Sequence, residues 1–152
     1  MEPDYIYDVS SLDKAIAYKI QRVARLLRLH LVKFLQDAGA GITPEQWFIL
    51  FRLYEQDGQS QGELADKDLH DHPNVTRMLD ALENRHLLAR RADPHDRRKS
   101  LIFLTEAGKQ LLAQVLPLTI EERKKVLNGL TPAEINLFAD ILKKIENNLV
   151  NS

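Results

Sequence analysis

The sequence predicts a mainly α-helical fold of the α+β type: a winged helix-turn-helix with a small β-hairpin wing, placed between long N- and C-terminal dimerisation helices. Three observations predict this fold. Apolar residues recur three or four positions apart along most of the 152-residue chain, as in amphipathic helices. Two short helical segments precede a stretch, residues 87–104, that is rich in alternating apolar and polar residues. The first and last helical segments carry apolar stripes that a small central module cannot cover.

The first predicted helix begins near Leu12, after residues 1–10, which lack periodicity and are expected to form an extended lead-in. It ends within residues 37–41, where glycine can adopt the left-handed conformation that closes a helix. A helix of this length exceeds what a small domain needs for its own core, so we expect it to pack against a second copy of the chain. Folding back within one monomer is the alternative. Its apolar stripe is Leu12, Ile16, Ile20, Val23, Leu27, Leu31 and Phe34.

Two capping boxes mark the next helices. Thr43-Pro-Glu-Gln46 combines an N-cap threonine, a proline in the first turn and a glutamine three residues on, and its helix is expected to stop near Asp57-Gly58. Trp47 in this helix is expected in the core. Ser60-Gln-Gly-Glu63 opens a short helix whose inner residues are Leu64, Ala65 and Leu69.

The second helix of the pair follows a turn at residues 68–71. Asp71 is its expected N-cap, although Pro73 would also allow His72 in that role. Its apolar face is Val75, Met78, Leu79 and Leu82. The opposite face carries side chains able to hydrogen-bond to base edges: Asn74, Arg77, Asp80 and Asn84. Because an α-helix fits the major groove of DNA, we predict that this is a recognition helix.

A hairpin is predicted next, with strands at residues 87–92 and 100–104 and a loop at residues 93–99. A basic loop beside a recognition helix can reach the neighbouring minor groove, so the hairpin is predicted to be a DNA-binding wing. Thr105 is expected to cap the helix that follows. Pro117 is expected to kink that helix, because proline removes the hydrogen bond to the carbonyl of Ala113.

The last helix opens at a third capping box, Thr131-Pro-Ala-Glu134. Its apolar stripe is Ile135, Phe138, Ile141, Leu142, Ile145 and Leu149. The chain is therefore predicted to contain two domains: a helical dimerisation domain of residues 10–41 with 106–150, and a winged helix-turn-helix DNA-binding domain of residues 42–105.

The charge distribution favours DNA binding more than the total charge does. The chain has a formal net charge of -1, but residues 77–99 hold seven Arg or Lys against four Asp or Glu, a balance of +3. The remaining residues hold fourteen against eighteen, a balance of -4. A basic patch on an acidic body is typical of a surface that contacts phosphate. An arginine-rich loop that is only solvated is the alternative.

Composition excludes several classes of function. The chain has no cysteine, which rules out disulfides, thiolate metal sites and cysteine-based redox sensing. Its first residues lack the basic and apolar regions of a signal peptide, and no apolar run approaches the length of a membrane span. We therefore expect a cytoplasmic protein without a membrane partner.

Five segments carry a resemblance to a known family: Ile42-Thr-Pro-Glu-Gln-Trp47, Ser60-Gln-Gly-Glu-Leu-Ala65, Asn74-Val-Thr-Arg-Met-Leu-Asp-Ala-Leu-Glu83, Asp93-Pro-His-Asp-Arg-Arg98 and Leu104-Thr-Glu-Ala-Gly108. They are similar to segments of the multiple-antibiotic-resistance regulator (MarR) family, and the likeness runs from about Leu12 to Leu149. It implies a homodimeric transcriptional regulator, expected to be a repressor, that binds pseudo-palindromic promoter sites on double-stranded DNA. It also implies a response to a small phenolic or aromatic effector.

The resemblance further implies roles for individual residues. Asp96 and Arg98 match the wing pair, in which the Asp braces an Arg that enters the minor groove. Asn74 and Arg77 occupy base-reading positions, at which they would pair with adenine and guanine edges. The expected phosphate or backbone contacts are Ser60, Gln61, His72, Thr76, Arg97 and Lys99.

The sequence departs from the family pattern at two places. His86 stands where the family usually has glycine, and a histidine there is strained if the backbone is left-handed. His72-Pro73 replaces the commoner polar pair at the start of the recognition helix, which leaves the operator sequence open.

Two other functions compete with this interpretation. His70-Asp71, with His30 upstream, faintly resembles the ligand pattern of metal-dependent phosphohydrolases, but it falls in a predicted turn, and other catalytic motifs are absent. We therefore predict no catalytic residues, no metal site and no cofactor. A winged helix used only for protein–protein contact is the second alternative. Such modules often lack a basic wing, so Arg97 to Lys99 count against it.

Overall fold

Helices make up most of the chain, as the periodicity predicts. The computed structural model describes residues 10–68 and 71–152, so the expectations for Leu69 and His70 lie outside the described residues. The chain divides into two compact units, Met1–Val115 and Leu116–Ser152, which are described in turn. The predicted grouping of residues 10–41 with 106–150 stays a prediction.

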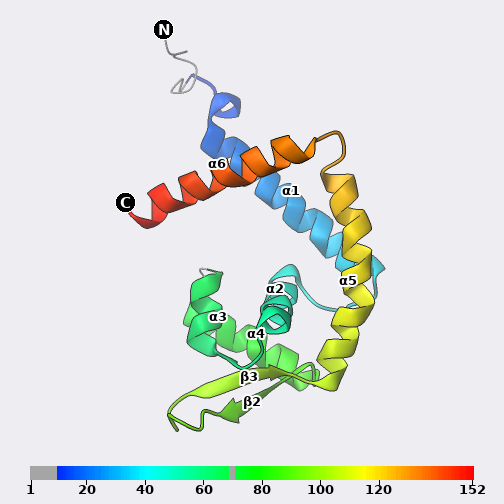
Figure 1. The fold of residues 1–152 in the computed structure, drawn as a ribbon, viewed down its shortest axis with the longest axis vertical. Helices are drawn as coiled ribbons and strands as arrows, with labels where there is room; N and C mark the ends of the chain where they lie inside the picture. The colour runs from blue at the N-terminus through cyan, green and yellow to red at the C-terminus, as the bar shows by residue number, and fades with distance from the viewer. Residues whose placement is uncertain (1–9, 69–70) are drawn as a thin grey trace. The chain divides into compact units, whose positions relative to one another are not determined.

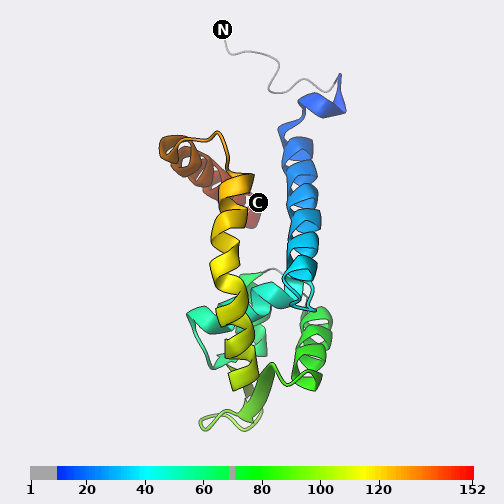
Figure 2. The same cartoon turned by 90° about the vertical axis from the view of Figure 1, so that its right-hand side faces the viewer.

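The first helix begins later than the apolar stripe predicts. A 3₁₀ turn, η2 (Leu12–Lys14), precedes the long helix α1 (Ile16–Asp37). Only Phe34 and Leu35 of α1 are buried, and both lie near its C-terminal end, where α1 meets the rest of its unit (Figure 2). Gly39, with φ at 67°, follows the end of the helix, as expected of a left-handed cap. Most of the apolar stripe of α1 is therefore left exposed.

Helix α2 (Pro44–Glu55) starts at the predicted capping box. The Thr43 hydroxyl accepts a hydrogen bond from the backbone N–H of Gln46 (3.2 Å), and the Gln46 side chain accepts one from the Thr43 N–H (3.0 Å). Trp47 is buried, which confirms its predicted place in the core. The other buried residues of α2 are Pro44, Ile49, Leu50 and Leu53.

The helix-turn-helix consists of α3 (Gln61–Lys67) and α4 (His72–Asn84). Ser60 caps α3 and Asp71 caps α4, so Asp71 rather than His72 holds the N-cap position. The buried residues of α4 are Val75, Leu79 and Leu82. The expectation for Met78 is only partly right, because its side chain is half-buried at the edge of that face.

The wing is part of a three-stranded sheet rather than the predicted two-stranded hairpin. Strands β2 (Leu88–Ala92) and β3 (Ser100–Leu104) pair antiparallel, with Leu88 opposite Leu104. The additional strand β1 (Gln59–Ser60) pairs with β3, with Gln59 opposite Ile102, and gives the order β1-β3-β2. A two-residue strand carries no alternation, so periodicity does not reveal it. Because β1 directly precedes α3, its pairing with β3 joins the hairpin to the helix-turn-helix. Figure 1 shows β2 and β3 beside α3 and α4.

A buried glutamine joins the end of α2 to the end of α3. Gln59 is buried, and its Nε2 donates to the carbonyl oxygens of Arg52 (2.8 Å) and Gln56 (2.5 Å) at the end of α2. Its Oε1 accepts from the Nζ of Lys67 (2.6 Å) at the end of α3. All the polar atoms of this amide are therefore hydrogen-bonded, which is the condition for burying it without penalty.

Helix α5 (Glu106–Val126) begins where predicted: the Thr105 hydroxyl accepts from the backbone N–H of Gly108 (3.1 Å). The helix contains Pro117 and continues into the second unit. There, α6 (Pro132–Val150) starts at the predicted capping box of Thr131 and Glu134, and none of its residues is buried.

No helix within residues 10–68 and 71–152 has both the length and the apolar character needed to cross a membrane.

Candidate nucleic-acid interface

The exposed face of α4 carries a chain of hydrogen bonds between predicted base-reading residues. Asp71 Oδ1 accepts from the backbone N–H of Asn74 (2.7 Å), and Asp71 Oδ2 accepts from Asn74 Nδ2 (3.2 Å). The other end of the same amide, Asn74 Oδ1, accepts from Arg77 Nη2 (2.7 Å). The three residues lie one helical turn apart and are exposed. The structure therefore brings Asn74 and Arg77 together on one face, as predicted.

The predicted phosphate contacts on the helix-turn-helix already have partners within the protein. The Ser60 hydroxyl accepts from the backbone N–H of Glu63 (3.2 Å) in the cap of α3. The amide of Gln61 donates to the hydroxyl of Thr76, and that hydroxyl donates to the carbonyl oxygen of His72 (2.9 Å). These bonds join the first turn of α3 to the first turn of α4. The His72 side chain is exposed at the start of α4.

The wing loop is held by its own backbone. Asp93 Oδ1 accepts from the N–H of His95 (2.8 Å), and the N–H of Asp93 donates to the carbonyl oxygen of Lys99 (3.0 Å). Asp96 Oδ1 accepts from the backbone N–H of Arg98 (3.0 Å). The expected bracing of Arg98 by Asp96 therefore acts through the backbone of the loop, whereas the resemblance implies a pair of side chains. A short carboxylate reaches the N–H two residues on more readily than a guanidinium that extends into solvent.

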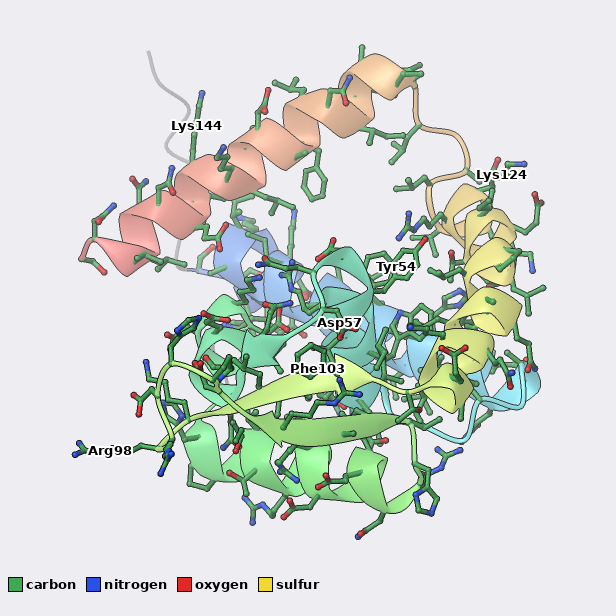
Figure 3. All side chains as sticks on the ribbon, turned by 60° about the horizontal axis from the view of Figure 1, so that its bottom comes forward. Tyr54, Asp57, Arg98, Phe103, Lys124 and Lys144 are labelled. Atoms are coloured by element: carbon green, nitrogen blue, oxygen red, sulfur yellow. The ribbon has the colours of Figure 1, made fainter. Side chains whose placement is uncertain are left out.

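The tip of the wing is open to solvent. Arg97, Arg98 and Lys99 are all exposed, and Figure 3 shows Arg98 extending away from the hairpin. A wing whose basic tip turned inward would have ruled out a contact with DNA.

Three of the seven cations in residues 77–99 serve the fold instead. Arg85 donates to the carbonyl oxygens of Gly41 and Ala40, and Arg91 lies over the ring of Phe103 at 5.0 Å from its centroid. Arg90 binds Glu83 and Asp80, with 2.7 Å between Arg90 Nη2 and Asp80 Oδ1. The four remaining cations of this segment form no ion pair within the described part of the chain; they are Arg77, Arg97, Arg98 and Lys99.

The ion pairs of Arg90 attach the wing to the recognition helix. Glu83 and Asp80 lie on α4, and Arg90 lies on β2, where its backbone N–H also donates to Glu83 Oε1 (3.2 Å). Both carboxylates of α4 therefore bind and orient the same arginine. The sequence does not identify Arg90 as the partner, because Arg85 lies closer to both carboxylates along the chain and Arg91 lies only one residue further away. The contact fixes the base of the wing relative to α4.

The turn between α4 and the wing has the left-handed backbone that the family glycine would favour. His86 has φ at 58°, and among the residues that the structure describes no other non-glycine residue has a positive φ. The hydroxyl of Thr105 donates to its carbonyl oxygen (2.5 Å). The left-handed backbone on which the expected strain at His86 depends is therefore present.

A shallow groove of about 360 Å³ lies between the start of α2 and the exposed face of α4, and the sequence gives no sign of it. Its lining residues are Thr43, Glu45, Gln46, Asn74, Arg77 and Met78. On α1, Arg28 donates to both carboxylate oxygens of Glu45, at 2.7 and 3.2 Å. This hydrogen bond and the charge of Glu45 raise the pKa of Arg28. One wall of the groove is thereby tied to the long first helix.

The described histidines, His30, His72, His86 and His95, belong to no cluster of metal ligands. Within residues 10–68 and 71–152, no three His, Cys, Asp or Glu side chains gather as metal ligands would. His30 is exposed on α1, and His95 is exposed in the wing loop.

Comparison with known proteins agrees with this geometry. A family model described as "MarR family" matches residues 42–100. The "Uncharacterized HTH-type transcriptional regulator YdgJ" of Bacillus subtilis (strain 168) is 31% identical over 141 residues, which cover 93% of this chain and 83% of that protein.

Solved structures share the fold. The transcriptional repressor CouR, bound to a 23-mer DNA duplex, has a TM-score of 0.82 and 26% identity, covering 91% of this chain and 97% of that chain. BpsR of Bordetella bronchiseptica, whose DNA binding is regulated by 6-hydroxynicotinic acid, has a TM-score of 0.70 and 27% identity, covering 84% and 98%. The similarity to YdgJ extends over nearly the whole chain, and the family model covers the module that carries α3, α4 and the wing. The chain therefore belongs to the MarR family of transcriptional regulators, which are not enzymes.

Proposed function

We propose that the protein acts in the cytoplasm as a homodimer that binds pseudo-palindromic promoter sites on double-stranded DNA and represses transcription until a small effector releases it. The observation that carries the proposal is the group of four cations, Arg77, Arg97, Arg98 and Lys99, that form no ion pair within the described residues. The phosphates of a duplex and the negative potential of its grooves would supply the missing counter-charges.

The module offers one element to each groove. Helix α4 would lie in the major groove, where Asn74 and Arg77 pair with adenine and guanine edges. The wing would follow the backbone into the adjacent minor groove, whose negative potential attracts Arg98. Arg97 and Lys99 would contact phosphates beside it. Further contacts to the DNA backbone would come from side chains at the start of α3 and α4; these are Ser60, Gln61, His72 and Thr76.

Two subunits are proposed because large apolar side chains remain uncovered within each unit. On α1, Ile16, Val23 and Leu26 are each at least half exposed, and on α6, Phe138 is 54% exposed. Residues of this kind are buried in stable proteins, and a second copy would cover them. A two-fold dimer would present two α4 helices to successive major grooves, about 34 Å apart.

Relatives support both the repressor role and the effector. CouR is a repressor that was solved on a DNA duplex, and 6-hydroxynicotinic acid regulates DNA binding by BpsR. A phenolic or otherwise aromatic compound is therefore the class of effector we propose.

A gel-shift titration on the promoter region of the protein's own gene tests the proposal. We expect a shifted complex whose affinity falls steeply as salt rises, by roughly one unit of log–log slope for each phosphate contacted. A winged helix that contacts only proteins would give no shift at any salt concentration. Analytical ultracentrifugation of the same sample tests the dimer, and a strictly monomeric protein would contradict it.

A further inference from the structure

We propose that Asp71 is a positioning residue that sets the base preference of α4 through Asn74 and Arg77, without contacting a base itself. The inference rests on the proposed function, because it requires α4 to read DNA. It adds a residue that neither base-reading geometry nor charge would select, since a carboxylate repels the DNA backbone.

The N-cap bond fixes the Asp71 side chain. Its Oδ1 accepts from the backbone N–H of Asn74 at 2.7 Å, which holds the carboxylate against the first turn of α4. The second oxygen, Oδ2, is thereby presented to the Asn74 side chain, and Asn74 Nδ2 donates to it at 3.2 Å. A cap needs only one acceptor, so the second bond is additional to the structural role of Asp71.

The second bond decides which way the Asn74 amide points. A carboxylate only accepts hydrogen bonds, so it selects the NH₂ end of the amide and turns the oxygen end away. That oxygen accepts from Arg77 Nη2 at 2.7 Å. The reversed amide would place Oδ1 against the Asp71 oxygen and the NH₂ group against the guanidinium, and both contacts would be repulsive.

A fixed amide gives the recognition face a fixed polarity. Asn74 keeps a second hydrogen on Nδ2 and a second lone pair on Oδ1, which is the pair of groups that an adenine edge requires. Arg77 spends one N–H on Asn74 and keeps its remaining donors for a guanine edge. The bonds involve charged groups and strengthen when DNA displaces water from the face. The three residues therefore form one pre-set reading unit.

The test is selection of bound duplexes from a library randomised over the half-site, with sequencing of the bound fraction, for the full-length protein and its variants. Asp71→Ser keeps an N-cap acceptor but has no second oxygen for Asn74. We expect it to lose about ten-fold in discrimination at the positions that Asn74→Ala and Arg77→Ala also flatten. We expect the slope of its salt dependence to stay unchanged, because no phosphate contact is removed.

Asp66→Ser is the matched control. Asp66 is an exposed carboxylate on α3 of the same helix-turn-helix, and its removal changes the charge of the module by the same amount. We expect the control to keep the parent's base preference. If Asp66→Ser flattens the same positions, the effect of Asp71 is one of net charge, and the proposal is overturned.

Asp71→Asn provides a second variant that keeps a good cap. We expect it to lose the same discrimination, because the NH₂ group that replaces Oδ2 is a donor and favours the reversed orientation of the Asn74 amide. Thermal unfolding establishes that each variant is folded. If either folded variant keeps the parent's base preference, Asp71 only caps the helix and the inference is wrong. A parent protein that enriches no sequence would refute the proposed function itself, which is a different result.

Discussion

A β-carbon built on Gly108 would lie 2.1 Å from the carbonyl oxygen of Leu87. Gly108 is in the first turn of α5, and Leu87 immediately precedes β2. The missing side chain therefore allows α5 to cross the base of the hairpin in direct backbone contact. The same carbonyl accepts from the backbone N–H of Thr105 (3.2 Å). Because the closest contact is between two backbone segments, no flexible side chain could move to make room for a β-carbon.

Gly108→Ala is therefore expected to destabilise the protein by about 2 kcal/mol or more, because a methyl group must push two backbones apart. Urea unfolding followed by circular dichroism measures this. Gly62→Ala on α3 is the control, since its β-carbon would meet nothing closer than 3.9 Å, and alanine in a helix is favoured over glycine by roughly 0.5–1 kcal/mol. Equal effects of the two substitutions would show that the contact with Leu87 is unimportant.

His86→Gly is expected to stabilise the protein by roughly 0.5–1 kcal/mol. A left-handed backbone costs about 1–2 kcal/mol for most residues, and the flexibility of glycine in the unfolded chain offsets part of that gain. Asn84→Gly, at the last residue of α4, is the control and should be destabilising by up to about 1 kcal/mol. A loss of stability in His86→Gly would mean that the imidazole makes a compensating contact.

Arg98→Ala is expected to weaken DNA binding by about ten-fold on matched and mismatched duplexes alike, because a cation in a minor groove responds to potential more than to sequence. Fluorescence anisotropy with a labelled duplex measures it at physiological salt. Arg25→Ala removes an exposed cation of α1 and should leave the affinity nearly unchanged. Binding by Arg98→Ala as tight as that of the parent would show that the wing is wrongly assigned.

If the proposed homodimer forms, Phe138→Asp is expected to convert it into monomers and to abolish cooperative binding to a two-half-site operator. The ring is 54% exposed on α6, and a charge buried between subunits would be far costlier than one in water. Sedimentation velocity reports the change. Lys143→Asp, outside the apolar stripe of the same helix, is the control and should sediment as the parent does.

The start of α6 should respond to acid through Glu134. The backbone N–H of Thr131 (2.7 Å) and then its hydroxyl (3.0 Å) donate to the carboxylate and lower the pKa of Glu134. Because folding lowers this pKa, the contribution to stability is complete above the ordinary value and is lost as the pH falls through the lowered one. An NMR titration should give a higher pKa for Glu134 in Thr131→Val. Identical titrations would exclude the hydroxyl hydrogen bond as a cause, because valine keeps the backbone N–H that also donates to Glu134.

Local signals in the sequence predicted helix starts and the wing strands well. All three capping boxes, at Thr43, Ser60 and Thr131, form with both of their hydrogen bonds, because each needs only residues three positions apart. Strand β3 has the predicted bounds, and β2 begins one residue later, at Leu88.

Features that depend on residues distant in the sequence were predicted less well. The partner of β1 lies over forty residues away, so the third strand was missed. The roles of the arginines depend on the same kind of information: Arg85 contacts Ala40 and Gly41, in the connection between α1 and α2, whereas Arg98 remains exposed. A count of charges from Arg77 to Lys99 identifies the surface but does not say which cations are available to it.

The amide of Gln59 has a practical consequence for transferring the recognition helix α4 and the wing onto another protein scaffold. The Gln59 side chain bonds to carbonyl oxygens at the end of α2 and to Lys67 of α3. The angle between α2 and α3 therefore depends on Gln59 and not on α4. A graft that carried α4 and the wing but replaced Gln59 with an apolar residue would leave three polar groups without a hydrogen-bond partner. It would also no longer fix the angle between α2 and α3. The smallest portable unit therefore starts before α2 ends.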